Sequence, residues 1–149
     1  MCTISREVFN SLRDVYANNM EVFQISAVTL KVSDMKKSLL FYSKIPGLSL
    51  RYRSANIESF SSFEIENGDF KSYLNLELSV KEKVLFTSNF GRIIFHTNNV
   101  DKLYLKLKND KELSEIIVFE NEPMNATWGE RFFHVKDPDG YELSFATPI

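Results

Sequence analysis

The chain has 149 residues, of which 44% are hydrophobic and 26% charged, and its 18 basic residues are nearly balanced by 20 acidic ones. This length and composition fit one domain with a hydrophobic core of its own. The net charge of -2 argues against the broad basic surface that is typical of nucleic-acid-binding proteins. The single cysteine, Cys2, excludes an internal disulfide and a cysteine-based zinc site.

Charged side chains occupy the N-terminal region, where a secretory signal would need an apolar stretch. They are Arg6, Glu7, Arg13 and Asp14. No apolar run approaches the roughly 20 residues of a membrane-spanning helix. We therefore expect a cytoplasmic domain with neither a membrane nor a nucleic acid as its partner.

Residues 5–19 have the pattern of an amphipathic helix. Val8, Leu12 and Val15 recur at helical spacing and form one apolar stripe. Such a stripe packs on its own domain, forms a dimer contact or acts as a lid, and the sequence leaves these alternatives open. We treat residues 1–24 as a helical extension and residues 25–149 as the domain proper.

Residues 25–80 have the pattern of a strand, a helix and three more strands. Ile25 to Val32 alternates apolar and polar side chains, as a half-buried strand does. Asp34 is placed to cap a helix that ends before Pro46-Gly47. The later strands are expected at 48–54, 57–66 and 70–79, with Asn67-Gly68 predicting a hairpin between the last two.

The same order of elements recurs over residues 90–147, offset by about 65 residues. Arg92 to Thr97 is a predicted strand, and Asn99 is placed to cap the following helix. Further strands are expected at 115–120, 130–136 and 141–146. The tetrapeptide Asp137-Pro-Asp-Gly140 suits a type I turn before the last of these. We predict an α+β fold of two βαβββ modules that form a curved mixed sheet around a shared cavity.

Three segments resemble the vicinal oxygen chelate superfamily, which includes glyoxalase I, extradiol dioxygenases and bleomycin-resistance proteins. They are AVTLKVSDMKKSLLFYSKIPGLSL, FGRIIFHTNNVDKL and WGERFFHVKDPDGYELSF. In order and at this spacing, they cover roughly residues 25–147. The resemblance implies the paired-module fold that the pattern of elements also predicts.

The resemblance also implies where a metal would bind. Enzymes of the family hold a divalent metal with four side chains, and these positions fall on Ala27, Glu77, Arg92 and Ser144, with Asn75 in place of Glu77 if the alignment shifts by two residues. Ala27 has no donor atom, and the guanidinium of Arg92 stays protonated and repels a cation. We therefore expect no metal and no cofactor at the family's position. We expect instead an ion pair between Arg92 and Glu77, within one chain or across a dimer.

Strand alternation predicts which side chains share the cavity with these positions. Thr29 and Lys31 follow Ala27, whereas Ile94 and His96 follow Arg92. The closing hairpin adds a further group of inward-facing side chains: Phe132, His134, Glu142, Ser144 and Ala146. Both histidines of the chain therefore point into one surface.

Three functions remain open for this cavity. A metal-free protein would bind a small anionic or aromatic molecule, as bleomycin-resistance proteins sequester a ligand, and we expect it to be a homodimer. Its candidate ligand-binding residues are Lys31, Glu77, Arg92, His96, Trp128, Phe132, His134 and Ser144. A scaffold with a vestigial pocket is the second possibility.

The third function is a glyoxalase-like lyase, isomerase or dioxygenase. In a metal-free version of this enzyme, His96 or His134 is the acid or base, and Arg92 stabilises an anionic intermediate. In the other form His96 and His134 hold a relocated metal together with Glu77 or Glu142. The candidate catalytic residues are accordingly His96, His134 and Glu142.

Overall fold

The computed structural model describes residues 25–53, 59–79 and 91–149. The predicted helix over residues 5–19, and with it the extension 1–24, lies outside the described residues. None of the helices within the described ranges is long and apolar enough to cross a membrane.

The first module forms a four-stranded sheet with one helix. Its elements are β1 (Ala27–Val32), α2 (Met35–Ser43), β2 (Ser49–Arg53), β3 (Phe60–Asn67) and β4 (Phe70–Leu78). The strand order is β1-β4-β3-β2, with β1 parallel to β4. The predicted order of elements is confirmed for this half of the chain.

The second module repeats this plan. Its elements are β5 (Arg92–His96), α3 (Val100–Lys108), β6 (Val118–Phe119), β7 (Met124–Asn125), β8 (Glu130–Lys136) and β9 (Glu142–Pro148). The strand order is β5-β9-β8-β6, β7 also pairs with β8, and β5 runs parallel to β9 as β1 does to β4. The two modules of an α+β fold are thus confirmed.

Both helices begin at the side chains that the sequence indicates. Oδ1 of Asp34 accepts a hydrogen bond from the backbone N–H of Lys37 at 3.1 Å. Oδ1 of Asn99 accepts one from the N–H of Lys102 at 2.9 Å. Each cap satisfies a donor that the first helical turn would otherwise leave unpaired.

Two local features differ from the prediction. In the β3–β4 hairpin Asn67 pairs with Phe70, so the turn is centred on Gly68-Asp69 and not on Asn67-Gly68. Gly68 adopts a φ of 63°, which glycine reaches at no steric cost. The strand predicted over 115–120 is reduced to the two residues of β6, and β7 had no signal in the sequence because two-residue strands carry no periodicity.

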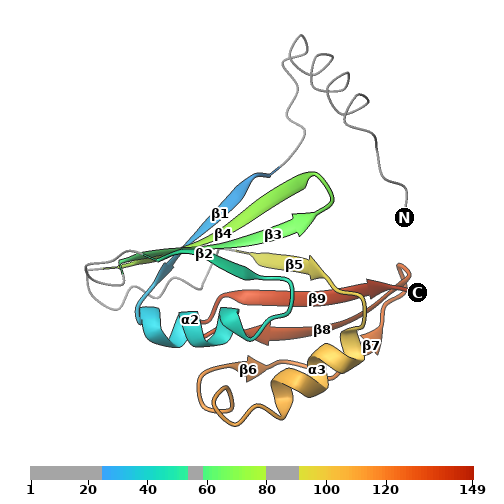
Figure 1. The fold of residues 1–149 in the computed structure, drawn as a ribbon. Coiled ribbons are helices and arrows are strands. Elements are labelled where there is room, and N and C mark those ends of the chain that lie inside the picture. Colours follow the sequence, from blue (N-terminus) through green and yellow to red (C-terminus); the bar gives the residue numbers. More distant parts are fainter. Residues whose placement is uncertain (1–24, 54–58, 80–90) are drawn as a thin grey trace, which may run out of the picture.

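Each module keeps its own sheet (Figure 1). Among the described residues no strand pairing joins the two sheets, and β1 and β5 are each at the end of the strand order. The curved mixed sheet expected from the sequence is therefore present as two separate mixed sheets within the described part of one chain. The backbone edges of β1 and β5 are instead the places where a further strand could pair.

A single hydrophobic core nevertheless connects the modules. The first sheet contributes Leu30, Phe63 and Leu74 to this core, and the second sheet contributes Phe133 and Leu143. All five residues are at most 2% exposed. Because these side chains alternate with polar ones along each strand, one face of each sheet is buried and the other carries the polar side chains.

The turn after β8 fastens the second module to the first. The Tyr42 hydroxyl donates to Oδ2 of Asp137 at 2.7 Å, and Oδ1 of Asp137 accepts from the backbone N–H of Asp139 and of Tyr141. Oδ1 of Asp139 accepts from the N–H of Ser33 beside the start of α2. The predicted turn thus also forms an interface between modules.

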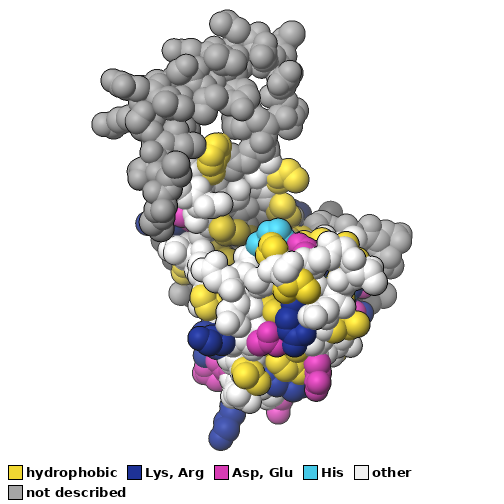
Figure 2. All heavy atoms as spheres, turned by 90° about the vertical axis from the view of Figure 1, so that its right-hand side faces the viewer, with side chains coloured by type: hydrophobic (Ala, Val, Ile, Leu, Met, Phe, Trp, Pro, Cys, Tyr) yellow, Lys and Arg dark blue, Asp and Glu magenta, His cyan; other side chains and the backbone are white. Residues whose placement is uncertain are grey.

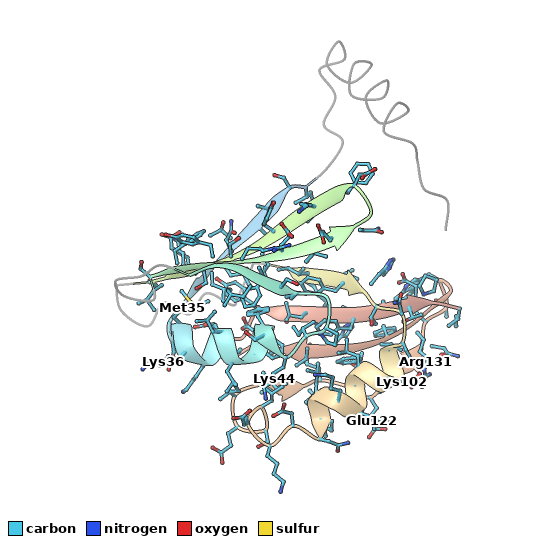
Figure 3. All side chains as sticks on the ribbon, in the orientation of Figure 1. Met35, Lys36, Lys44, Lys102, Glu122 and Arg131 are labelled. Carbon is cyan, nitrogen blue, oxygen red and sulfur yellow. The ribbon has the colours of Figure 1, made fainter. Side chains whose placement is uncertain are left out.

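Lys44 at the end of α2 makes a second connection, to the segment that follows α3 (Figure 3). Its Nζ lies 2.9 Å from Oδ2 of Asp110 and 2.5 Å from Oε2 of Glu112. The hydrogen bonds to Lys44 hold the pKa of Asp110 below its ordinary value. Both connections therefore run between parts of the chain about 65 to 100 residues apart.

Burial raises the pKa of Asp137 from 3.8 to about 6. Because the folded chain holds this proton more tightly than the unfolded chain, the free energy of unfolding should decrease as the pH rises through this interval. The full difference is about 3 kcal/mol, of which about 1 kcal/mol falls between pH 5 and pH 7. Urea denaturation of the wild type and of Asp137→Asn should show this loss in the wild type alone.

The comparison with Asp137→Asn also removes the contribution of His134. The lowered pKa of His134 makes the free energy of unfolding increase as the pH rises towards 6.5, which is opposite in sign to the effect of Asp137. This increase is the same in the wild type and in Asp137→Asn. Parallel pH profiles for the two proteins would contradict the assignment to Asp137.

Candidate functional site

The polar face of the second sheet carries both histidines, and we call it the histidine face. It is composed of Arg92, Ile94 and His96 on β5, Glu142, Ser144 and Ala146 on β9, and Glu130, Phe132, His134 and Lys136 on β8. Backbone register sets three rows across it: Arg92–Glu142–Lys136, Ile94–Ser144–His134 and His96–Ala146–Phe132. Side chains in one row project to the same side, so the predicted common surface for the histidines is present.

Arg92 is the centre of a charge network at one end of this face. One guanidinium nitrogen contacts Oε2 of Glu120 at 2.9 Å and the backbone carbonyl of Leu143 at 3.1 Å. The other contacts Oε2 of Glu142 at 3.0 Å. Nζ of Lys136 lies 3.8 Å from Glu120. The side chain of Arg92 is 24% exposed, so part of its positive charge still faces outward.

Glu77 lies on the other sheet and has a different partner. It is beside Lys31 in the register of β1 and β4, and the two side chains form an ion pair at 2.5 Å. The expected pair between Arg92 and Glu77 is therefore not formed within the chain. Within one chain the prediction was wrong, because it took over the convergence of a metal site, whereas each charge finds an opposite charge on its own sheet. The same pair across a dimer stays a prediction.

The side chains at the four metal positions that the resemblance implies do not suit a cation. Ala27 offers no donor, Arg92 brings a positive charge, and Glu77 is already paired. Ser144 is 3% exposed and offers only a neutral hydroxyl. Asn75, the alternative to Glu77, instead accepts a hydrogen bond from Ser62 at 2.7 Å. This donor set supplies none of the convergent anionic or imidazole ligands that a divalent metal needs.

The two histidines do not converge on one ion either. His96 is on β5 and His134 on β8, in different rows, with β9 between them. Two strand spacings alone separate them by roughly 10 Å. In the described part of the chain, no group of three or more His, Cys, Asp or Glu side chains is placed to hold a metal ion.

His134 lies in a partly buried environment that keeps it neutral. Burial lowers the pKa of its imidazole, and the nearby charge of Arg92 lowers it further. Its ring lies 4.7 Å from that of Phe132, and its backbone N–H donates to Asn121. Nδ1 of His134 is buried and has no hydrogen-bond partner among the described residues. His134 is therefore a neutral hydrogen-bonding group, and it is paired with Ser144 in the register of β8 and β9.

His96 has a carboxylate partner that the sequence analysis missed. Nε2 of His96 lies 2.8 Å from Oε1 of Glu130, and Nε1 of Trp128 donates to Oε2 of the same carboxylate at 2.9 Å. Trp128 also stacks on Phe132. Glu130 is two residues before Phe132 on β8, so strand alternation alone could have placed it on the histidine face.

A second cluster that was missed lies on the first sheet, around Glu64. This carboxylate accepts two hydrogen bonds from Arg51, and Lys71 and the Tyr73 hydroxyl each lie 3.3 Å from Oε2. The bonds from Arg51 hold the pKa of Glu64 below its ordinary value. The register that pairs Glu64 with Tyr73 creates the cluster, and no local sequence pattern indicates it.

Comparisons with known proteins agree with this architecture. The model of the Glyoxalase/Bleomycin resistance protein/Dioxygenase superfamily matches residues 24–145. No protein with a curated description matches the chain in sequence.

Solved structures share the fold at low sequence identity. A glyoxalase/dioxygenase from Nostoc punctiforme is 18% identical with a TM-score of 0.64, and the match covers 85% of this chain and 91% of that chain. A glyoxalase/bleomycin resistance protein/dioxygenase from Nocardioides is 18% identical with a TM-score of 0.60, over 95% and 93%. TioX from Micromonospora sp. ML1 is 14% identical with a TM-score of 0.61, over 85% and 100%.

The charge network predicts which residues are energetically coupled to Arg92. In double-mutant cycles with alanine, we expect a coupling of about 0.5–1 kcal/mol between Arg92 and Glu142, because both side chains are partly exposed. Between Arg92 and Glu77 we expect none. Urea denaturation of the single and double variants measures both quantities. A coupling of Arg92 to Glu77 as large as its coupling to Glu142 would contradict this expectation and would support the ion pair expected from the sequence.

Proposed function

The chain belongs to the Glyoxalase/Bleomycin resistance protein/Dioxygenase superfamily, and we propose that within it this protein binds a small molecule without a metal ion. The observation that carries the proposal is the side-chain set at the family's four metal positions. Alanine, a paired glutamate, arginine and a buried serine take the places of metal ligands. Arg92 is the decisive one, since its charge repels a cation at any ordinary pH.

The remaining groups on the histidine face suit a small organic ligand. Trp128, which stacks on the buried Phe132, supplies aromatic surface, and Arg92, His96 and His134 supply polar groups. Ser144 is buried and does not face a ligand in the single chain. Apolar walls with a few oriented polar groups are typical of small-molecule sites. The partly exposed charge of Arg92 favours a ligand with an anionic group, and the rings favour an aromatic one.

Lys31 and Glu77 enter this site only if two chains associate. They lie on the first sheet, which is not paired with the second within the chain. We propose a homodimer in which β1 of one chain pairs with β5 of the other, because both are edge strands among the described elements. Members of the superfamily bind small-molecule ligands and often dimerise, which supports this arrangement. A cytoplasmic location suits a chain whose single cysteine forms no internal disulfide.

An enzymatic role is the second candidate, and the contact between His96 and Glu130 is the observation that favours it. A carboxylate beside an imidazole orients a histidine that acts as acid or base in a lyase, isomerase or dioxygenase reaction. Of the other candidates, Glu142 is engaged by Arg92, and burial disfavours the charged form of His134. His96 is thus the strongest candidate for acid–base chemistry on this face.

The metal-free proposal predicts the composition of the purified protein. Native mass spectrometry and elemental analysis should find less than stoichiometric Zn, Ni, Fe and Mn, and should find any retained ligand to be an organic molecule. About one metal per chain would contradict the proposal. As a positive control, Ala27→His combined with Arg92→His and Ser144→Glu should gain metal affinity in the proposed dimer. There β1 of one chain lies beside β5 of the other, so donors at three of the four positions come together.

The dimer proposal predicts a change in solution mass when the β5 edge is altered. Ile94 on β5 is 62% exposed in the single chain. Ile94→Asp should convert a dimer into a monomer in sedimentation experiments, because it places a charge at the proposed interface. Val118→Asp is the matched control, since Val118 is 60% exposed on β6 at the opposite edge of the sheet. A monomeric wild type, or equal effects of both substitutions, would contradict pairing through β5.

A further inference from the structure

We propose that Trp128, His96 and Glu130 form a recognition site for a planar aromatic ring with a hydrogen-bond donor on its edge. In this site Trp128 stacks on the ring, Nδ1 of His96 accepts from the donor, and Glu130 is the positioning residue. The inference rests on the proposed small-molecule-binding function and gives that function a ligand class. Figure 2 shows a histidine among hydrophobic side chains, with an acidic side chain beside it, on the face turned to the viewer.

The Glu130 carboxylate determines which nitrogen of His96 carries the proton. The hydrogen bonds from Trp128 and His96 hold the pKa of Glu130 below its ordinary value, so the group is an ionised carboxylate that only accepts. Its Oε1 lies 2.8 Å from Nε2 of His96, so Nε2 must be the donor. In the neutral imidazole the lone pair is then on Nδ1. The His96 side chain is 63% exposed, which leaves it accessible to a ligand.

The indole of Trp128 is held in place although it is exposed. Its Nε1 donates to Oε2 of Glu130 at 2.9 Å, and its ring stacks on Phe132 with centroids 5.7 Å apart and an interplanar angle of 22°. The residue is nevertheless 69% exposed. One indole face is thus covered by Phe132 and the edge is fixed, so stacking on the outer face costs little additional side-chain entropy.

The two recognition elements are adjacent because they share one carboxylate. His96 also lies in the same row as Ala146 and Phe132, and Ala146 between them has only a methyl group. We expect a ring that stacks on the outer face of Trp128 to bring a donor on its edge within reach of the imidazole, because both side chains bond to Glu130. A purely apolar ring would leave this acceptor unused, whereas a ring with an N–H or hydroxyl group would donate to it. A ring with such a donor is therefore favoured over an apolar ring by one hydrogen bond.

The tautomer of His96 can be tested without any ligand. The chain has two histidines, and their ¹⁵N chemical shifts at about pH 8, above the ordinary histidine pKa, report which ring nitrogen is protonated. We expect His96 with the proton on Nε2. In Glu130→Gln the amide oxygen should keep the indole bond and the amide N–H should donate to Nε2, which moves the proton to Nδ1. Glu122→Gln makes the same chemical change at an exposed position and should leave His96 unchanged.

The ligand class is tested with 5-fluoroindole and its N-methyl derivative, which lacks the donor. Ligand-observed ¹⁹F NMR on the full chain should show wild type and Glu122→Gln binding 5-fluoroindole about 3–10-fold more tightly than the methylated compound. Glu130→Gln should abolish this preference. Trp128→Ala should weaken the binding of both compounds. In the wild type, binding of either compound should change the fluorescence of Trp128, which is the single tryptophan of the chain.

Four results would overturn the inference. They are equal binding of the two indoles to the wild type, a preference that survives Glu130→Gln, a wild-type His96 protonated on Nδ1, and failure of both indoles to bind. In each of these cases the proposed function would still hold if native mass spectrometry finds another organic molecule bound. The inference and the proposed function would both be wrong only if a stoichiometric metal is found.

Discussion

The buried hydrogen bond between Tyr42 and Asp137 joins two modules whose described strands do not pair with each other. Tyr42 is fully buried on α2 of the first module, and Asp137 is 3% exposed in the turn before β9 of the second. Burial raises the pKa of both groups, so the tyrosine hydroxyl keeps its proton and is an effective donor to the carboxyl group. Since Asp137 also accepts two backbone N–H groups of its own turn, the same carboxyl shapes the turn and fastens it to α2.

This connection leaves the polar faces of both sheets available. The helices and the shared core cover one face of each sheet, and the charged side chains gather on the other. On the histidine face, Arg92 is held between Glu120 and Glu142, and on the first sheet Lys31 is held by Glu77. Arg92 and Glu77 are at two of the positions where the resemblance implies that enzymes of the family hold a metal, and here each is paired with an opposite charge. A change of function away from metal chemistry is thus compatible with an unchanged fold, because the site residues are not those that build the core.

The arrangement of His96, Glu130 and Trp128 also explains why an exposed tryptophan is ordered. A large apolar side chain on a surface usually gains little from a fixed position, but here one carboxylate and one aromatic ring hold it. The same carboxylate orients an imidazole, so apolar surface and a directional acceptor are presented together. That combination is what distinguishes a binding surface from a merely exposed hydrophobic patch.

The sequence by itself determined the order of the elements, the helix starts at Asp34 and Asn99, and which side chains share a face of each strand. These features depend on local backbone geometry, whose periods are visible in a single segment. Only the tertiary structure decided the partners of the charged groups. Arg92 meets Glu120 and Glu142, and not Glu77, because strand register and the course of the segment after β6 determine which side chains approach it. Contacts between segments far apart in the chain have no local pattern, so their physical origin lies in how the strands of each module pair and pack.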